Sequence, residues 1–128
     1  MATYGPEPLK KTFKAAGDLS TKQYTAVKLS AAETVTTCGA GEAGVGILTN
    51  KPAAAGRPAS VWVGVGYAKL KVDGSGTAIS AGDYLKSDAN GLGVKTTTDN
   101  EVIIARALEA SSASGDIIEV ETRPAYRY

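Results

Sequence analysis

The stretch SVWVGVGYAKLKV, from Ser60 to Val72, carries the clearest strand signal in the chain. The period-two alternation of a strand divides it into two faces, one of them apolar. The apolar face holds Trp62, Gly64, Gly66, Ala68, Leu70 and Val72, and the other face holds Lys69 and Lys71 near its end. Two glycines inside such a run indicate a bulge, a bend or the close approach of another backbone. The stretch therefore predicts a β-strand that is irregular near its middle.

Segments on both sides of this stretch have the same β-rich composition. Strands are expected within residues 24–30, 33–38 and 44–50, where β-branched residues gather. Further on, Asp88-Ala89-Asn90-Gly91 lies between two apolar stretches. Because Asn-Gly tolerates positive φ, this tetrapeptide predicts a β-hairpin.

The C-terminal third of the chain contains one ambiguous segment. Asn100 is able to cap a helix through 105–110, whereas the apolar run 102–104 suits a buried strand. The β elements on both sides favour the strand. A last strand is expected within residues 114–124, and Pro124 is expected to end it.

Turn signals recur about every ten residues between these segments. Gly-Asp pairs precede β-like runs at Gly17-Asp18, Gly82-Asp83 and Gly115-Asp116, but their irregular spacing argues against a repeat architecture. Many short strands separated by turns are typical of an all-β barrel or sandwich. The predicted fold class is therefore all-β, with one small barrel-like domain.

The two ends of the chain differ from its middle. Residues 1–20 predict an N-terminal arm, because Gly5, Pro6 and Pro8 disfavour regular structure and LKKTFKAAGDLS shows no clean period. The β-rich domain is expected to span residues 21–124. Residues 125–128 then form a short aromatic and basic tail.

Length and charge limit the classes of function. A chain of 128 residues forms one domain, and a formal net charge of +1 gives no electrostatic reason to expect nucleic acid or a membrane as the main partner. No apolar run approaches the ~18 residues of a membrane span, and the N-terminus lacks the apolar core of a signal peptide. We expect a soluble protein made in the cytoplasm.

The absence of histidine excludes much chemistry. Ser-His and Cys-His nucleophile pairs are not available, and a zinc site would have to combine the single cysteine, Cys38, with carboxylates. Asp83 and Asp88, on either side of Tyr84, are explained by turn chemistry. We therefore expect no catalytic residues, no metal and no cofactor.

One motif points the other way. Gly39-Ala40-Gly41-Glu42-Ala43-Gly44 matches the G-x-G-x-x-G turn of dinucleotide-binding proteins. That turn needs a helix after it and an acidic residue ~20 positions on. Here Pro52 follows soon, and the next acidic residue after Glu42 is Asp73. The motif instead predicts a turn with positive φ at one or more of Gly39, Gly41 and Gly44, and no bound ligand.

The order of the pieces along the chain is more informative than any single motif. It runs GIL (46–48), AAAGRP (53–58), a V-x-V-x-G-x-A-K strand, I-x-A-G-D-x-L (79–85), SDANG (87–91), ALEA (107–110), SGDIIEV (114–120) and RP (123–124). Over about residues 20–124 this pattern resembles the phage capsid cement or decoration proteins, which are related in fold to the head decoration protein of phage lambda.

This resemblance implies a β-tulip barrel, no catalysis, and trimers at three-fold and quasi-three-fold positions on the outer surface of an expanded head. The implied partners are the major capsid protein and two further copies of the chain, and the implied location is the virion. Because the N-terminal arm of such proteins often reaches the shell, we expect capsid contacts at Leu9, Lys10, Lys11, Thr12, Phe13 and Lys14. Trp62 and Tyr67 are the expected subunit-interface residues.

Two other functions remain open at this point. Trp62, Tyr67 and Tyr84 on a β scaffold are compatible with a virion-surface module that binds a glycan or the host. A nucleotide-dependent enzyme rests on the glycine motif alone.

Overall fold

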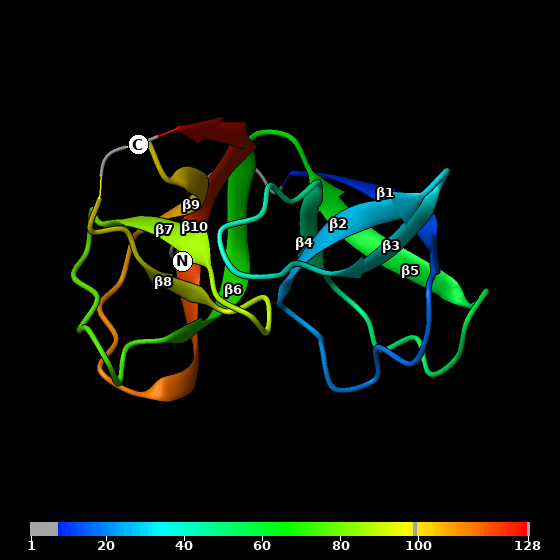
Figure 1. Ribbon diagram of the computed structural model, residues 1–128, viewed down its shortest axis with the longest axis horizontal. Helices are drawn as coiled ribbons and strands as arrows, with labels where there is room; N and C mark the ends of the chain where they lie inside the picture. The colour runs from blue at the N-terminus through cyan, green and yellow to red at the C-terminus, as the bar shows by residue number, and fades with distance from the viewer. Residues whose placement is uncertain (1–7, 99, 128) are drawn as a thin grey trace, which may run out of the picture.

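The computed structural model describes residues 8–98 and 100–127, with the side chains of 123–127 left out of the description. These residues form ten strands and no helix (Figure 1). The strands are β1 (Leu9–Ala15), β2 (Ala26–Ala31), β3 (Thr34–Thr37), β4 (Gly46–Leu48), β5 (Pro58–Val63), β6 (Gly66–Asp73), β7 (Tyr84–Ser87), β8 (Gly93–Lys95), β9 (Val102–Ala107) and β10 (Ser114–Arg127).

The strands close into two small barrels that lie side by side in Figure 1. The first barrel has the strand order β1-β3-β2-β4-β5, and the second has the order β10-β6-β8-β7-β9. The predicted all-β class is confirmed, but the chain forms two barrels where one was expected. The likeness to a β-tulip stays a prediction.

The two barrels have the same topology. In each, the first strand runs parallel to the third and antiparallel to the fifth. In each, the second strand pairs antiparallel with the third and the fourth, and the fourth pairs antiparallel with the fifth. The sequence does not reveal this shared order, because strand and loop lengths differ between the two halves of the chain.

Each barrel encloses apolar side chains, as alternating strands require. The cluster inside the first barrel comprises Phe13, Ala15, Leu19, Val27, Val35, Leu48, Ala59 and Val61. The second cluster comprises Ala68, Leu70, Val72, Ile79, Leu85, Ala105, Ala107, Ile118 and Val120, and it also includes Ile47 and Trp62 from the first barrel. The second core therefore extends across the boundary between the barrels.

The opening stretch Ser60–Val72 makes this crossing. It is two strands, β5 and β6, joined by a turn in which Gly64 has a φ of 80°. Along β5, Val61 points into the first barrel and Trp62 points out of it, into the cluster of the second. The predicted bend at the glycines is confirmed at Gly64, but the prediction of one strand was wrong, because the turn divides the stretch between two barrels.

Backbone hydrogen bonds also join the two barrels. The Lys71 N–H of β6 donates to Tyr24 O, just before β2, at 2.7 Å. The Ala26 N–H donates to Gly91 O at 2.9 Å. Since bonds of this kind and a common apolar cluster cross the boundary, the two barrels pack as one body.

Both ends of the domain differ from the sequence prediction. Leu9–Ala15, which we had placed in an arm, forms β1 and pairs along β5 from Leu9↔Val63 to Lys14↔Pro58. Tertiary pairing overrides the irregular local pattern there. Pro124 does not end β10, because the register shifts between Thr122 and Tyr126 and an irregularity of this kind tolerates proline. The expected tail residues 125–127 are therefore part of β10, whereas residues 1–7 and 128 lie outside the described residues.

Two other strand predictions are confirmed. β7 and β8 form the antiparallel hairpin around Asp88–Gly91, and Gly91 has a φ of 77°. The ambiguous segment after Asn100 is the strand β9.

Candidate functional site

The glycine motif forms the loop between β3 and β4. Gly41 has a φ of 70°, so the prediction of positive φ in this motif is confirmed at one of its three glycines. The Gly41 N–H donates to Ser87 O of the second barrel at 2.9 Å. No helix follows the loop, and this part of the chain therefore lacks the dipole that holds a pyrophosphate.

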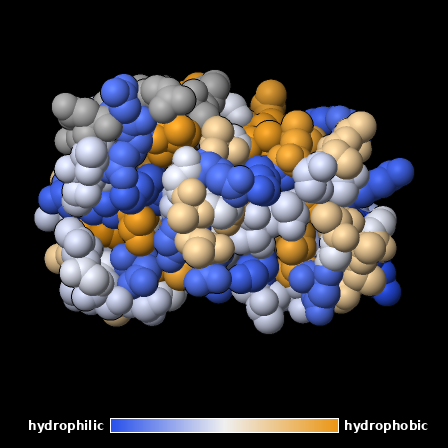
Figure 2. Space-filling view, viewed as in Figure 1, coloured by the Kyte–Doolittle hydropathy of each residue, from blue (hydrophilic) through white to orange (hydrophobic). Residues whose placement is uncertain are grey.

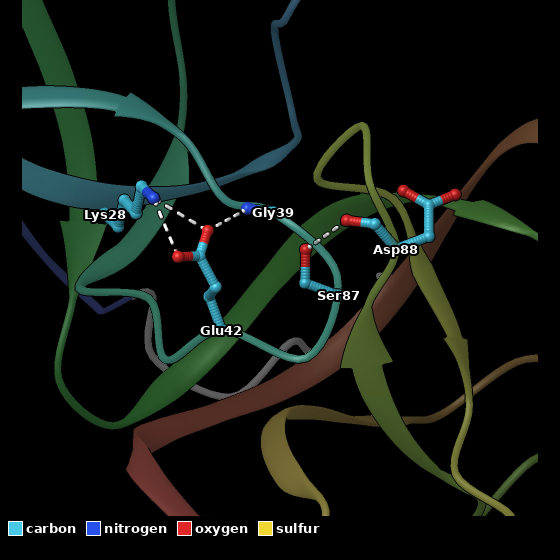
Figure 3. A network of polar contacts seen from close by, with 5 residues as sticks. All are labelled: Lys28, Gly39, Glu42, Ser87 and Asp88. Atoms are coloured by element: carbon cyan, nitrogen blue, oxygen red, sulfur yellow. Dashed lines mark hydrogen bonds and ion pairs between the residues drawn. The ribbon is translucent and has the colours of Figure 1, made fainter.

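A carboxylate of the same loop accepts the hydrogen bond of a backbone N–H group in the glycine motif. Glu42 Oε1 accepts a hydrogen bond from the Gly39 N–H at 2.5 Å, and Lys28 Nζ contacts both carboxylate oxygens at 2.7 and 2.8 Å (Figure 3). The hydrogen bonds from Lys28 and from Gly39 lower the pKa of Glu42. The donor that a phosphate would need is satisfied by the protein's own anion.

The second barrel has an equivalent arrangement. Glu101, in the loop between β8 and β9, accepts hydrogen bonds from the N–H groups of Thr97 and Thr98 at 2.9 Å and pairs with Lys86. Bonds from Lys86, Thr98 and Thr97 lower the pKa of Glu101 to about 2. Lys28 and Lys86 both lie on the second strand of their barrel, and both glutamates lie on the loop after the third. The glycine motif is therefore one of two structural lysine–glutamate clamps.

The other residues considered for chemistry have structural roles. Asp88 Oδ1 accepts from the N–H groups of Asn90 and Leu92, and Asp83 Oδ2 accepts from the Ser80 N–H, as turn residues do. Cys38 is fully buried, and burial raises the pKa of its thiol to about 12. Among the described residues, no group of three His, Cys, Asp or Glu side chains is placed to hold a metal ion.

No helix capable of spanning a bilayer occurs in the part of the chain that the structure describes.

The predicted contact residues on β1 divide into exposed and buried ones. Leu9 is 80% exposed, and Lys10, Lys11, Thr12 and Lys14 are exposed as well. Phe13 is only 7% exposed because its ring fills the first barrel. Phe13 therefore anchors β1 to the apolar core of the first barrel and offers little surface to a partner.

An apolar residue that the sequence analysis missed extends this surface. Val65, in the turn between β5 and β6, is 69% exposed and follows Val63, the cross-strand neighbour of Leu9. Alternation along an uninterrupted strand also places Val65 on the polar side that carries Lys69 and Lys71, and the turn puts it just beyond the partner of Leu9. We call these exposed residues together the β1 surface: Leu9 and Lys11 on the strand face of Phe13, Lys10, Thr12 and Lys14 on the opposite face, and Val65 in the turn.

Figure 2 shows hydrophobic side chains at the upper edge of the molecule, around the junction of the barrels, and hydrophilic ones over much of the remaining surface. Contiguous apolar residues rimmed by charge are typical of protein-binding surfaces.

The two aromatic residues expected at a subunit interface lie in different surroundings. Trp62 is 8% exposed and stacks on Tyr24, with ring centroids 6.0 Å apart. Its ring therefore lies at an interface, but between the two barrels of one chain. Tyr67 is half-buried on β6, opposite Glu121 of β10, and retains surface for a partner.

Comparison with known families gives one result that covers both barrels. A family model described as phage cement protein matches residues 9–122. No curated protein matches the chain.

Proposed function

The chain belongs to the phage cement protein family, and on that premise we propose that it binds the outer surface of an expanded phage head and holds neighbouring shell subunits together. The resemblance found in the sequence is confirmed by the family match, and a role in stabilising a phage capsid follows from it. The outer surface and the expanded state of the head are our proposal.

The observation that supports this proposal best is the β1 surface. It presents two strongly exposed apolar side chains: Leu9, which precedes Lys10 and Lys11 in β1, and Val65, two residues beyond Val63, the cross-strand partner of Leu9. Apolar anchors of this kind contribute most of the affinity at an interface, and the charged rim orients the partners and raises the rate of association. The expected partner is the major capsid protein.

The closed barrels favour docking through side chains. Among the described residues every strand belongs to a closed barrel, although β1 pairs with β3 only at Lys14 and Ala15, so one edge of Leu9–Phe13 has no strand partner. Most strand edges are therefore covered, and outward-facing side chains supply most of the surface offered to a partner.

Three copies at a three-fold or quasi-three-fold position remain part of the proposal, which rests here on the resemblance to lambda-type decoration proteins. Tyr67 is the residue we assign to the interface between copies, since Trp62 is covered within its own chain. A trimer would gain avidity, because docking of one subunit raises the effective concentration of the others.

The proposed role requires neither catalysis nor a cofactor. The lysine–glutamate clamps and the turn aspartates have structural partners, and the family is a structural one. The glycan-binding alternative loses its main support because Trp62, the central aromatic of that hypothesis, is buried.

The test is sedimentation of the purified protein with expanded shells that lack it. We expect the protein to sediment with the shells, and the variant Val65→Asp to do so with an affinity lower by about ten-fold. Leu29→Asp is the matched control, because Leu29 is 50% exposed and lies on β2 outside the β1 surface. Unaltered protein that stays in the supernatant would overturn the proposal. Equal losses of shell affinity in Val65→Asp and Leu29→Asp would show that the β1 surface is not the docking surface.

A further inference from the structure

A groove of about 320 Å³ lies at the boundary between the two barrels, outside the β1 surface. Its walls are residues of the 20–24 loop before β2, together with Lys51, Lys71 and Ile117. In Figure 1 the loop that leads into β2 passes near the lower end of β6, the strand that carries Lys71. Both barrels therefore contribute to the groove.

The groove is basic. Ion pairs within the described residues involve Lys11, Lys28, Lys86 and Lys95, but neither Lys51 nor Lys71. No acidic residue lines the groove, and the hydroxyl group of Thr21 adds a hydrogen-bond donor, whereas the Ser20 hydroxyl is engaged by Asp18. Two ammonium groups and a hydroxyl in one groove match a carboxylate ligand.

The groove also has an apolar side. Ile117 is 47% exposed and lies directly across the β6–β10 ladder from Lys71. A partner that places an acidic side chain near the lysines brings its neighbouring residue against Ile117. The surface therefore suits a short segment in which an acidic residue is flanked by an apolar one.

The groove is fixed before any partner binds. Tyr24 has a φ of 65°, which is unfavourable for a residue with a side chain. This conformation is held on both sides, because the Tyr24 N–H donates to Leu48 O and Tyr24 O accepts from the Lys71 N–H. Its ring stacks on Trp62. A preformed wall lowers the entropy lost on docking.

The common topology of the barrels connects Lys71 with the β1 surface. Ala15 of β1 pairs with Val35 of the third strand, and Val72 of β6 pairs with Gly93 of the third strand in the second barrel. The residues before them, Lys14 and Lys71, both point outward, so each barrel carries an outward lysine near the end of its first strand.

We propose that this groove is a second docking point, which binds an acidic segment of the phage shell protein through Lys51 and Lys71 and an adjoining apolar residue through Ile117. The inference deepens the proposed function and rests on it. Two separate docking points on one chain would raise the affinity for the shell above that of either.

The first test compares shell binding by Lys51→Glu/Lys71→Glu and by single variants of β6. Lys71→Glu and Lys69→Glu are matched, because both lysines point outward from one strand two residues apart and only Lys71 lines the groove. We expect the double variant to bind about ten-fold more weakly and Lys69→Glu to change binding by less than about two-fold, with all variants remaining folded. Double-variant binding equal to that of the unaltered chain would overturn the groove proposal while leaving the proposed function intact.

The second test needs no shells and is decisive if the unaltered chain fails to sediment with them. The isotope-labelled protein is titrated with a synthetic peptide of alternating Glu and Leu, and with the same peptide carrying Gln in place of Glu. Amide shifts at residues 20–24, Lys71 and Ile117 that occur only with the Glu peptide support the groove. Absence of those shifts, or equal shifts with both peptides, contradicts it.

Discussion

The two barrels share one topology and differ in how they are filled. The first barrel encloses its own cluster, centred on Phe13 and Leu48. The cluster of the second barrel is completed by Trp62 and Ile47, which point out of the first. The two barrels therefore have the same strand order but are not equally able to fold alone, because the core of the second barrel needs side chains that the first one supplies.

Charge separates the barrels as well. Residues 8–65 contain seven basic and three acidic side chains, whereas residues 66–127 contain seven basic and nine acidic ones. The excess of positive charge thus lies on the first barrel, which also carries the β1 surface. A net charge of +1 for the whole chain conceals this difference.

The largest expected effect comes from removing a strand of one barrel. Deletion of residues 1–20 removes β1, which pairs with both β3 and β5, so the first barrel loses its closure. We expect loss of cooperative unfolding and of most dispersed amide signals in two-dimensional NMR spectra. Deletion of residues 1–7 is the control and should retain them. A folded second barrel in the longer deletion would show that it is independent after all.

The next effect concerns the residue that crosses the boundary. Trp62→Ala should lower the free energy of unfolding by about 3–5 kcal/mol, because a large buried ring is lost from the second core. Denaturant unfolding should remain a single transition. Val65→Ala, three residues away and exposed, should change stability by less than about 0.5 kcal/mol. Two separated transitions in either protein would contradict the joint core.

A glycine at the same boundary gives a smaller effect. A Cβ on Gly46 would lie 1.9 Å from Trp62 O, whereas a Cβ on Gly17 would meet nothing within 4 Å. Gly46→Ala should therefore destabilise the protein by about 1–3 kcal/mol or more through overpacking. Gly17→Ala should be near neutral in the same thermal unfolding experiment. Similar melting temperatures for the two variants would show that β4 and β5 can separate without cost.

The smallest effect compares the two clamps. A carboxyl group whose pKa is lowered by folding stabilises the protein above its unfolded pKa, and that stability is lost as the pH falls through the folded pKa. For Glu101 the loss should extend from about pH 4.5 to about pH 2. In the variant Glu101→Gln, the urea concentration at the midpoint of unfolding should fall less steeply with pH across this range. Glu42→Gln should act in the same direction, and an unchanged profile in both variants would remove the clamps from the acid response.

Much of the fold is predictable from local sequence. Alternation in Ser60–Val72 correctly grouped Trp62 with Ala68, Leu70 and Val72, which all enter one cluster. The hairpin at Asp88–Gly91 followed from residues that tolerate positive φ. β1 was missed, since Leu9 and Lys11 share a strand face with the buried Phe13 and yet lie exposed. A strand with so few buried positions has little periodic signal.

The surfaces were less predictable than the strands. The β1 lysines were proposed from family resemblance, whereas Val65, which alternation places on the polar face of Ser60–Val72, was not chosen as a contact residue. The groove joins Lys51 and Lys71, which come from different barrels. No local pattern connects two such residues, because their proximity depends on how the barrels pack.

The sequence by itself determined the β class, the turns and the absence of histidine chemistry, because these depend on residue type and on spacing over a few positions. The tertiary structure decided that Ser60–Val72 divides between two barrels, that Trp62 belongs to the core of the second, and that Glu42 fills the loop resembling a phosphate site. These outcomes depend on contacts between segments distant in the chain. Strand pairing across 20 to 50 residues, such as that of β1 with β5, is stabilised only when both partners are present.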